Sequence, residues 1–198
     1  MDPIILLILQ SVYFLLPAYF ANMAPVVAKK LGLMKALDVP VDEGKRFIDS
    51  REILGKNKTY RGFVAGAIAG LIIAYVQMAL YNIPNMPFFK YISIPNLNYS
   101  SHLIVISLGI LMGVGAITGD ALKSFFKRRM NIGPGKKFIP FDQIDFVVGA
   151  YIFIIPLIIL YDIGFNWQII LCSIILSFLL HIIVNHISFY LGIRGEKW

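Results

Sequence analysis

Three aspartates at the ends of apolar stretches are the residues of this sequence best suited to chemistry. Asp120 follows one long apolar stretch, and Asp142 and Asp145 begin the next, three residues apart. Residues at this spacing share one helical face, so two packed helices would bring the three carboxylates together. Carboxylates without His or Cys favour Mg²⁺, which also takes ligands from water and substrate phosphate. The spacing therefore predicts a magnesium site for a nucleotide phosphate, with helix capping by Asp142 and Asp145 as the alternative.

Basic side chains between these acids could hold the phosphates. Lys123 and Lys127 share one helical face, with Ser124 beside it. Two like charges so placed are unfavourable unless an anion lies between them, and a triphosphate would supply that anion. Arg128 and Arg129 have a more ordinary interpretation, because basic residues just inside a membrane span usually serve topology and anionic headgroups.

A second basic motif, GKNKTYRG at residues 55–62, precedes another apolar stretch. Asn57 can donate and accept hydrogen bonds, Lys58 and Arg61 can contact an anion, and Thr59 is expected to cap the following helix. The motif alone is weakly specific. Its importance lies in facing the same compartment as the aspartates.

Membrane helices are the elements that must position these residues. Hydrophobic residues make up 58% of the 198 and charged residues 15%, with a mean hydropathy of +0.75, which excludes the soluble globular class. A helix that crosses the ~30 Å hydrocarbon layer needs ~20 apolar residues. The sequence therefore predicts an all-α integral membrane protein, one membrane domain over residues 1–198, with five transmembrane helices. The expected spans are about 4–24, 63–82, 102–119, 144–161 and 167–190, with cytoplasmic loops at about 29–62 and 120–143.

The basic residues also predict the orientation. Of 18 Lys and Arg residues, nine lie within 29–61, six within 123–137, and two more are Arg194 and Lys197. Only Lys90 falls on the other side. The positive-inside rule then places the N-terminus outside and the C-terminus in the cytoplasm. We expect a multi-pass protein of the cell membrane whose active site faces the cytoplasm.

Other features favour ordinary roles. The net charge of +7 sits beside apolar stretches, so nucleic acid is not an expected partner. The lone Cys172 supports neither an intramolecular disulfide nor a zinc site. The glycines of 66–70 and of the third span are expected to let helices pack closely. We expect His181, Asn185 and His186 to form hydrogen bonds between helices and not to bind metal.

At these motifs the chain resembles the archaeal CDP-archaeol synthases, which are relatives of the CDP-diacylglycerol synthases. The resemblance covers most of the chain and is densest at LGKNKTYRGF (54–63), GDALKSFFKRR (119–129), PGKKFIPFDQIDF (134–146) and the tail NHISFYLGIRGEKW. The broad cytidylyltransferase signature begins S-x-x-K-R, as residues 124–128 do, and ends D-R-x-D, where this chain reads DQID. The bacterial pattern has a K-D pair and an H-G-G before the final acids. In this chain Gly133 and Pro134 occupy the positions of the K-D pair, and the H-G-G is absent. These departures resemble the shorter archaeal form.

The resemblance implies transfer of CMP from CTP to 2,3-bis-O-(geranylgeranyl)-sn-glycerol 1-phosphate, with release of pyrophosphate. It implies Mg²⁺ as the cofactor, and CTP, an isoprenoid ether-lipid phosphate and the bilayer as partners. The resemblance leaves open whether the protein forms a homodimer. The implied metal ligands are Asp120, Asp142 and Asp145, which with Lys127 form the candidate catalytic set. The implied substrate-binding residues are Asn57, Lys58, Arg61, Lys123, Ser124, Arg128 and Lys137.

Three alternatives stay open on the sequence. A cytidylyltransferase for diacyl phosphatidic acid and a CTP-dependent lipid-alcohol kinase would both use the same phosphate and Mg²⁺ chemistry. A membrane transporter belongs to a different class, and it would be expected to carry ionisable residues at mid-membrane. Here the acids and bases gather at one side of the membrane.

Overall fold

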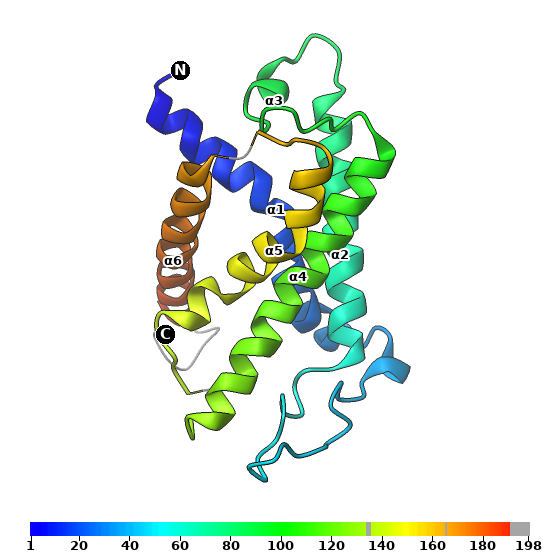
Figure 1. The fold of residues 1–198 in the computed structure, drawn as a ribbon, viewed down its shortest axis with the longest axis vertical. Coiled ribbons are helices and arrows are strands. Elements are labelled where there is room, and N and C mark those ends of the chain that lie inside the picture. The colour runs from blue at the N-terminus through cyan, green and yellow to red at the C-terminus, as the bar shows by residue number, and fades with distance from the viewer. Residues whose placement is uncertain (134–135, 165, 191–198) are drawn as a thin grey trace.

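The chain folds into a bundle of long helices joined by loops at its two ends (Figure 1). The computed structural model describes residues 1–133, 136–164 and 166–190, without the side chains of 184, 185 and 187–189. Asn185, Pro134, Arg194 and Lys197 therefore lie outside the described side chains. The long helices are α1 (Pro3–Lys30), α2 (Tyr60–Tyr81), α4 (His102–Arg129), α5 (Phe141–Leu160) and α6 (Trp167–Tyr190); the short ones are η1 (Lys35–Leu37) and α3 (Phe88–Tyr91).

The all-helical membrane fold is confirmed. Among the described residues, α1, α2, α4 and α5 are long and apolar enough to cross a membrane, and a shorter apolar helix, Trp167–Ile183, lies within α6. The fifth span and the orientation stay predictions. Thr59 caps α2 as expected, since its Oγ1 accepts a hydrogen bond of 3.3 Å from the Gly62 N–H.

Helix α4 is longer than the predicted span. It continues to Arg129, so the cytoplasmic connection predicted at about 120–143 begins with helical residues, and Lys123 and Lys127 share a helical face as expected. Hydropathy falls after Gly119 because charged residues begin there, but helical hydrogen bonding does not depend on hydropathy. The helix therefore runs on past the apolar part and carries the polar residues with it.

Glycines let α4 approach both of its neighbours, as predicted from their spacing. On one side, Gly109 and Gly113 face Gly70 and Gly66 of α2. On the other side, Gly119 is so close to α5 that an added methyl group would lie 2.9 Å from the carbonyl carbon of Asp145. The close approach of α4 and α5 sets the distance between Asp120 and the aspartates of α5.

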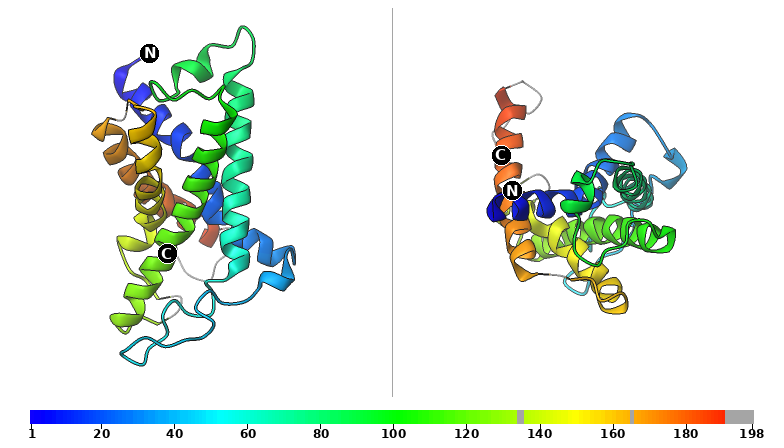
Figure 2. Two further views of the ribbon diagram at one scale, coloured as in Figure 1. Left: turned by 45° about the vertical axis from the view of Figure 1, so that its right-hand side comes forward. Right: turned by 90° about the horizontal axis from the view of Figure 1, so that it is seen from above.

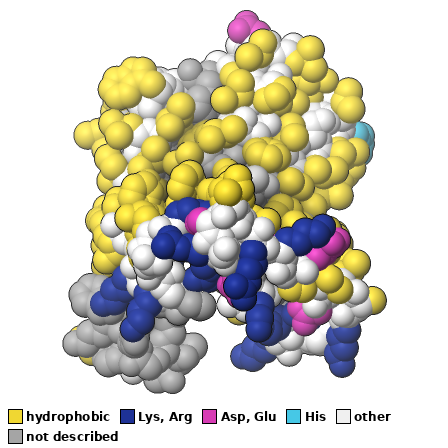
Figure 3. All heavy atoms as spheres, turned by 60° about the horizontal axis from the view of Figure 1, so that its bottom comes forward, with side chains coloured by type: hydrophobic (Ala, Val, Ile, Leu, Met, Phe, Trp, Pro, Cys, Tyr) yellow, Lys and Arg dark blue, Asp and Glu magenta, His cyan; other side chains and the backbone are white. Residues whose placement is uncertain are grey.

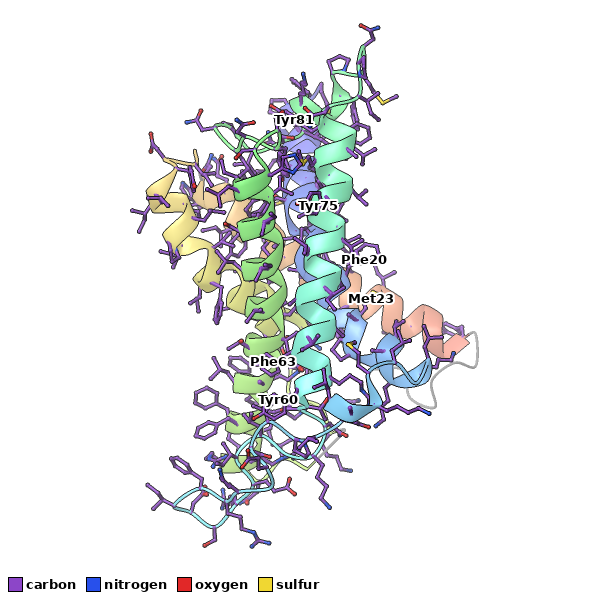
Figure 4. All side chains as sticks on the ribbon, turned by 90° about the vertical axis from the view of Figure 1, so that its right-hand side faces the viewer. Phe20, Met23, Tyr60, Phe63, Tyr75 and Tyr81 are labelled. Atoms are coloured by element: carbon purple, nitrogen blue, oxygen red, sulfur yellow. The ribbon has the colours of Figure 1, made fainter. Side chains whose placement is uncertain are left out.

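The outer surface of the bundle suits hydrocarbon. Phe20 and Met23 of α1 lie beside α2 (Figure 4), 48% and 61% exposed, and Tyr75 of α2 is 37% exposed. The core consists mostly of apolar side chains, and Phe14, Leu108, Met112 and Ile154 are fully or almost fully buried. Helix α6 packs against α1 and α5 at the side of the bundle (Figure 2).

The loop from 31 to 59 lies at the same end of the bundle as the loop between α4 and α5 (Figure 1). Asp42 organises it by accepting hydrogen bonds from the backbone N–H groups of Gly44 (3.1 Å), Leu54 (2.8 Å) and Gly55 (3.0 Å). Burial alone would raise the pKa of Asp42, but these hydrogen bonds lower it below its usual value. The two polar segments therefore meet at one end, as the sequence predicts.

Candidate active site

The three aspartates converge on one ammonium group. Lys123 Nζ of α4 lies 3.0 Å from Asp120 Oδ1, 3.2 Å from Asp142 Oδ1 and 2.7 Å from Asp145 Oδ2. Asp120 comes from α4, and Asp142 and Asp145 come from the first two turns of α5. The spacing thus places the carboxylates where the sequence predicts, although what lies between them is the side chain of Lys123.

Two further lysines complete the cluster. Lys58, from the loop before α2, donates to Asp120 Oδ2. Lys127 Nζ lies 3.2 Å from Asp142 Oδ1 and also donates to the Lys136 carbonyl. Three negative charges are therefore balanced by three positive ones, and the six residues come from three parts of the chain: the loop before α2, α4 and α5. We call these six residues the Asp–Lys cluster.

The most buried carboxylate is that of Asp145, whose side chain is 6% exposed. Its Oδ1 accepts a hydrogen bond of 2.7 Å from the Phe146 N–H. Its Oδ2 lies 2.7 Å from Lys123 Nζ, so the ammonium group is the partner of this oxygen. A buried carboxylate oxygen so placed retains the capacity to bind another cation.

A small polar pocket opens beside the cluster. It has a volume of about 180 Å³ and is lined by Leu54, Asn57, Lys58, Lys123, Ser124, Lys127 and Arg128. Basic side chains gather on this end of the molecule, below the apolar surface (Figure 3). Four cationic side chains around a cavity of this size suit phosphate groups.

Of the seven predicted substrate-binding residues and Lys127, six line the pocket and two do not. Arg61 is not among the described residues that line it, and its Nη2 lies 2.7 Å from Asp38 Oδ1. Lys137 is exposed and is likewise absent from the lining residues. Leu54, which lines the pocket, was missed because no chemical property of leucine distinguishes it in the sequence.

The histidines of α6 lie apart from this site. His186 Nδ1 is 2.8 Å from the carbonyl oxygen of Ile182. That contact falls within α6, one turn back along the helix. The hydrogen bonds between helices expected for His181, Asn185 and His186 stay a prediction. The GKNKTYRG motif and the aspartates, in contrast, meet directly through Lys58 and Asp120.

The donor set fits a divalent metal ion in its chemistry. Asp120, Asp142 and Asp145 offer carboxylate oxygens within reach of one shared cation, which in the structure is the ammonium group of Lys123. Within the part of the chain that the structure describes, no group of three or more acidic, His or Cys side chains is arranged to hold a metal as it stands. Lys123 contacts all three carboxylates, so it must move before they can share an ion.

An apolar groove begins one helical turn beyond Asp145. It has a volume of about 250 Å³. The hydroxyl of Tyr151 donates to Ser173 Oγ at 2.7 Å, so this polar group is satisfied. The groove lies between α5 and α6 and is lined by Val148, Tyr151, Ile152, Ile155, Ile158, Ile170 and Ile174.

Together the fold and the site define a multi-pass membrane protein that carries a charged, phosphate-sized pocket at one end of its helix bundle. Comparison with known proteins makes this class more specific. The chain belongs to the family of CDP-archaeol synthases: the family model described as "CarS-like: CDP-archaeol synthase" matches residues 4–198. Membership of this family makes the chain a CTP-dependent cytidylyltransferase that acts on a membrane lipid phosphate.

Several relatives are similar over most of their length. The CDP-archaeol synthase of Methanocaldococcus jannaschii is 36% identical over 97% of this chain and 98% of its own. That of Methanosarcina barkeri is 37% identical over 93% and 100%, and that of Pyrococcus horikoshii 39% identical over 75% of each chain. The structure is also similar to that of an intramembrane enzyme for archaeal membrane lipid biosynthesis, with a TM-score of 0.63, 28% identity, and coverage of 90% of this chain and 94% of the other.

Proposed function

We propose that the chain transfers CMP from CTP to 2,3-bis-O-(geranylgeranyl)-sn-glycerol 1-phosphate in archaeal ether phospholipid synthesis. The observation that carries the proposal is the meeting of Asp120, Asp142 and Asp145 with Lys58, Lys123 and Lys127 beside a basic pocket. The family relationship supplies the nucleotide and the lipid phosphate as substrates. The site is proposed to face the cytoplasm, where CTP is found.

The lipid phosphate is the nucleophile in this reaction. A phosphate monoester is largely dianionic at pH 7, because its second pKa is about 6, so its attack needs no general base. One of its oxygens forms a bond to the α-phosphorus of CTP while the bond from that phosphorus to the bridging oxygen breaks. Pyrophosphate leaves with the electron pair. The protein therefore has to align two anions and offset their repulsion.

The residues of the cluster divide into two groups for this task. Asp120, Asp142 and Asp145 would hold Mg²⁺, which supplies charge neutralisation between the triphosphate and the attacking phosphate. Lys58, Lys123 and Lys127 exchange their carboxylate partners for phosphate oxygens of CTP. Asn57, Ser124 and Arg128 complete the pocket around the nucleotide, while Arg61 and Lys137 carry the same assignment on the resemblance alone.

The apolar groove between α5 and α6 is proposed to take an isoprenoid chain of the lipid. Val148, at the start of this groove, is three residues after Asp145, which is about 4.5 Å along the helix axis. A lipid whose phosphate sits at the Asp–Lys cluster can therefore keep its chains on the hydrocarbon side. This arrangement provides the lateral opening that a membrane substrate needs.

A labelling assay tests the proposal. Purified protein in nanodiscs receives CTP labelled at the α or the γ phosphate, together with ether-linked or ester-linked lipid phosphates of both glycerol configurations. Transfer of the α label to the ether lipid, with release of pyrophosphate, is expected. Transfer of the γ label to a lipid alcohol would indicate a kinase instead, and preference for diacyl phosphatidic acid would contradict the lipid assignment.

Two variants connect the assay to the site. Asp145→Asn is expected to abolish transfer while the protein stays folded. The Asp–Lys cluster lies at the start of α5, whereas Asp162 follows the other end of this helix, which is at Leu160. Asp162→Asn should therefore leave activity unchanged. Full activity of Asp145→Asn would refute the role assigned to the cluster.

A further inference from the structure

Two arginines fasten the loop before α2 to the C-terminal end of α4. Arg51, in this loop, donates through Nη1 to the carbonyl oxygens of Arg128 (3.3 Å) and Arg129. In return Arg129 Nη1 donates to the loop carbonyls of Glu52 (2.9 Å) and Ile53 (3.1 Å). We call Arg51 and Arg129 the arginine clamp.

Two aromatic rings and one acidic side chain hold Arg129 of the clamp in place. The guanidinium carbon of Arg129 lies 3.8 Å from the ring centre of Phe125 on α4 and 4.7 Å from that of Phe47 on the loop. Arg129 Nε is 3.5 Å from Asp49 Oδ2. Its side chain is only 19% exposed, so Arg129 is directed into the protein and away from lipid headgroups.

The position of the clamp relates it to the nucleotide pocket. One wall of the pocket is Leu54, Asn57 and Lys58 of the loop, and the other is Lys123, Ser124, Lys127 and Arg128 of α4. The loop carbonyls that Arg129 holds, at 52 and 53, immediately precede the first wall. The clamp therefore sets the distance between the two walls.

Substrate binding makes this attachment more important. In the structure Lys58 also ties the loop to α4, through Asp120. Under the proposed function Lys58 leaves Asp120 for a phosphate of CTP. The contact between the loop and α4 through Asp120 is then lost while CTP is bound. The arginine clamp uses backbone carbonyls and rings outside the pocket, and it persists through that exchange.

We infer that Arg51 and Arg129 are positioning residues that preorganise the loop wall of the CTP pocket and thereby determine CTP affinity. The inference rests on the proposed function. Lysine cannot replace arginine at 129, because only the planar guanidinium can stack on two rings and donate to several carbonyls at once. Preorganisation acts on binding, so the clamp should influence KM for CTP and leave the chemical step unchanged.

Hydrogen exchange of the full chain in nanodiscs, without substrates, tests the first half of the inference. In Arg129→Lys the amides of residues 47–58 should exchange about tenfold faster, with α2 and the apolar part of α4 unchanged. Unchanged exchange in 47–58 would overturn the inference, and so would faster exchange throughout α2 and α4, which would indicate a general role in stability.

Kinetics and CTP binding test the second half. Arg129→Lys should raise KM for CTP about tenfold and change kcat and KM for the lipid phosphate by no more than about twofold. Arg46→Gln is the matched control, because Arg46 lies in the same loop and, among the described residues, its side chain donates to the Ser50 carbonyl at 3.4 Å and to no group of α4. A wild-type KM in Arg129→Lys, or a lower kcat at constant KM, would overturn the inference.

Two provisions keep the test decisive. Arg51→Lys removes the other half of the clamp and must give the same pattern if Arg129→Lys does not fold. Equilibrium binding of CTP reports the effect of the clamp even if the wild-type protein transfers no CMP, in which case the proposed reaction fails and the clamp is still tested.

Discussion

Substitution of Gly119 by alanine tests whether the approach of α4 and α5 sets the geometry of the site. The added methyl group would lie 2.9 Å from the carbonyl carbon of Asp145 and 3.2 Å from Gly149 Cα. Carbon atoms pack at about 3.5–4.0 Å, and the carbonyl oxygen of Asp145 would be nearer still to the methyl group, so the two helices must separate by about 1 Å or more at this point. Asp145 would then move away from Asp120 by a similar amount.

The expected cost falls mainly on catalysis. A displacement of about 1 Å in a positioned group can reduce a rate about 100-fold, so kcat of Gly119→Ala should fall by about that factor. Overpacking should also lower stability by about 1–3 kcal/mol, part of which the better helix propensity of alanine offsets. Steady-state transfer of α-labelled CMP, corrected for the folded fraction, measures the first effect.

Gly70→Ala separates catalysis from folding. Its methyl group would lie 3.0 Å from Gly113 Cα, which is a similar clash at the contact of α2 with α4. Gly113 precedes Asp120 by about 10 Å along α4. Gly70→Ala should therefore lose stability to a similar degree while keeping most of its kcat. Equal loss of kcat in both variants, or normal kcat in Gly119→Ala, would refute the reasoning.

Three further predictions follow from the cluster, the groove and the loop. Lys123→Met leaves the three carboxylates without their shared cation, so the variant should be about 3 kcal/mol less stable than the wild type without metal. Added Mg²⁺ should raise the unfolding temperature of Lys123→Met more than that of the wild type. An equal rise in both would contradict competition between Lys123 and the ion. Ile152→Trp fills the groove and should lower kcat/KM about tenfold for the C20 lipid while sparing a short-chain analogue, because only long chains reach the site. Asp42 has a lowered pKa, so its contribution is fully present above the unfolded value of about 3.8 and is lost as pH falls through the lower folded value. The protection of the amides of residues 44–55, measured against their intrinsic exchange rates, should therefore fall below about pH 4, whereas Asp42→Asn should show low protection at every pH.

The convergence of the acids could be predicted because it depends on short-range geometry. Asp142 and Asp145 are one turn apart at the start of a helix, and Asp120 lies shortly before the loop that joins this helix to its neighbour. Consecutive helices are usually neighbours in space, and if these two pack together on their polar faces, the carboxylates converge. The same logic predicts Lys123 and Lys127 on one face of α4.

The loop before α2 could not be placed in this way. Arg51 and Arg129 are 78 residues apart in sequence, and no periodicity connects a loop arginine to the carbonyls of a distant helix end. We therefore interpreted Arg129 as a residue that sets membrane topology, a role that any arginine beside a span can fill. Arg61 likewise pairs with Asp38, a partner that the motif around it does not contain.

The balance of charges in the Asp–Lys cluster explains how one site can be stable beside the bilayer and still receive highly charged substrates. Three carboxylates at the ends of apolar helices would repel one another and resist burial, so each must be paired before substrate arrives. The lysine side chains can exchange these carboxylates for substrate phosphates, because an ammonium group can move from a carboxylate to a phosphate with little movement of the backbone. Under the proposed function, the released carboxylates would then bind the metal ion that accompanies the nucleotide. Under the proposed function, the same acid–lysine contacts would stabilise the fold before substrate binds and would be exchanged for contacts to phosphate and metal during catalysis.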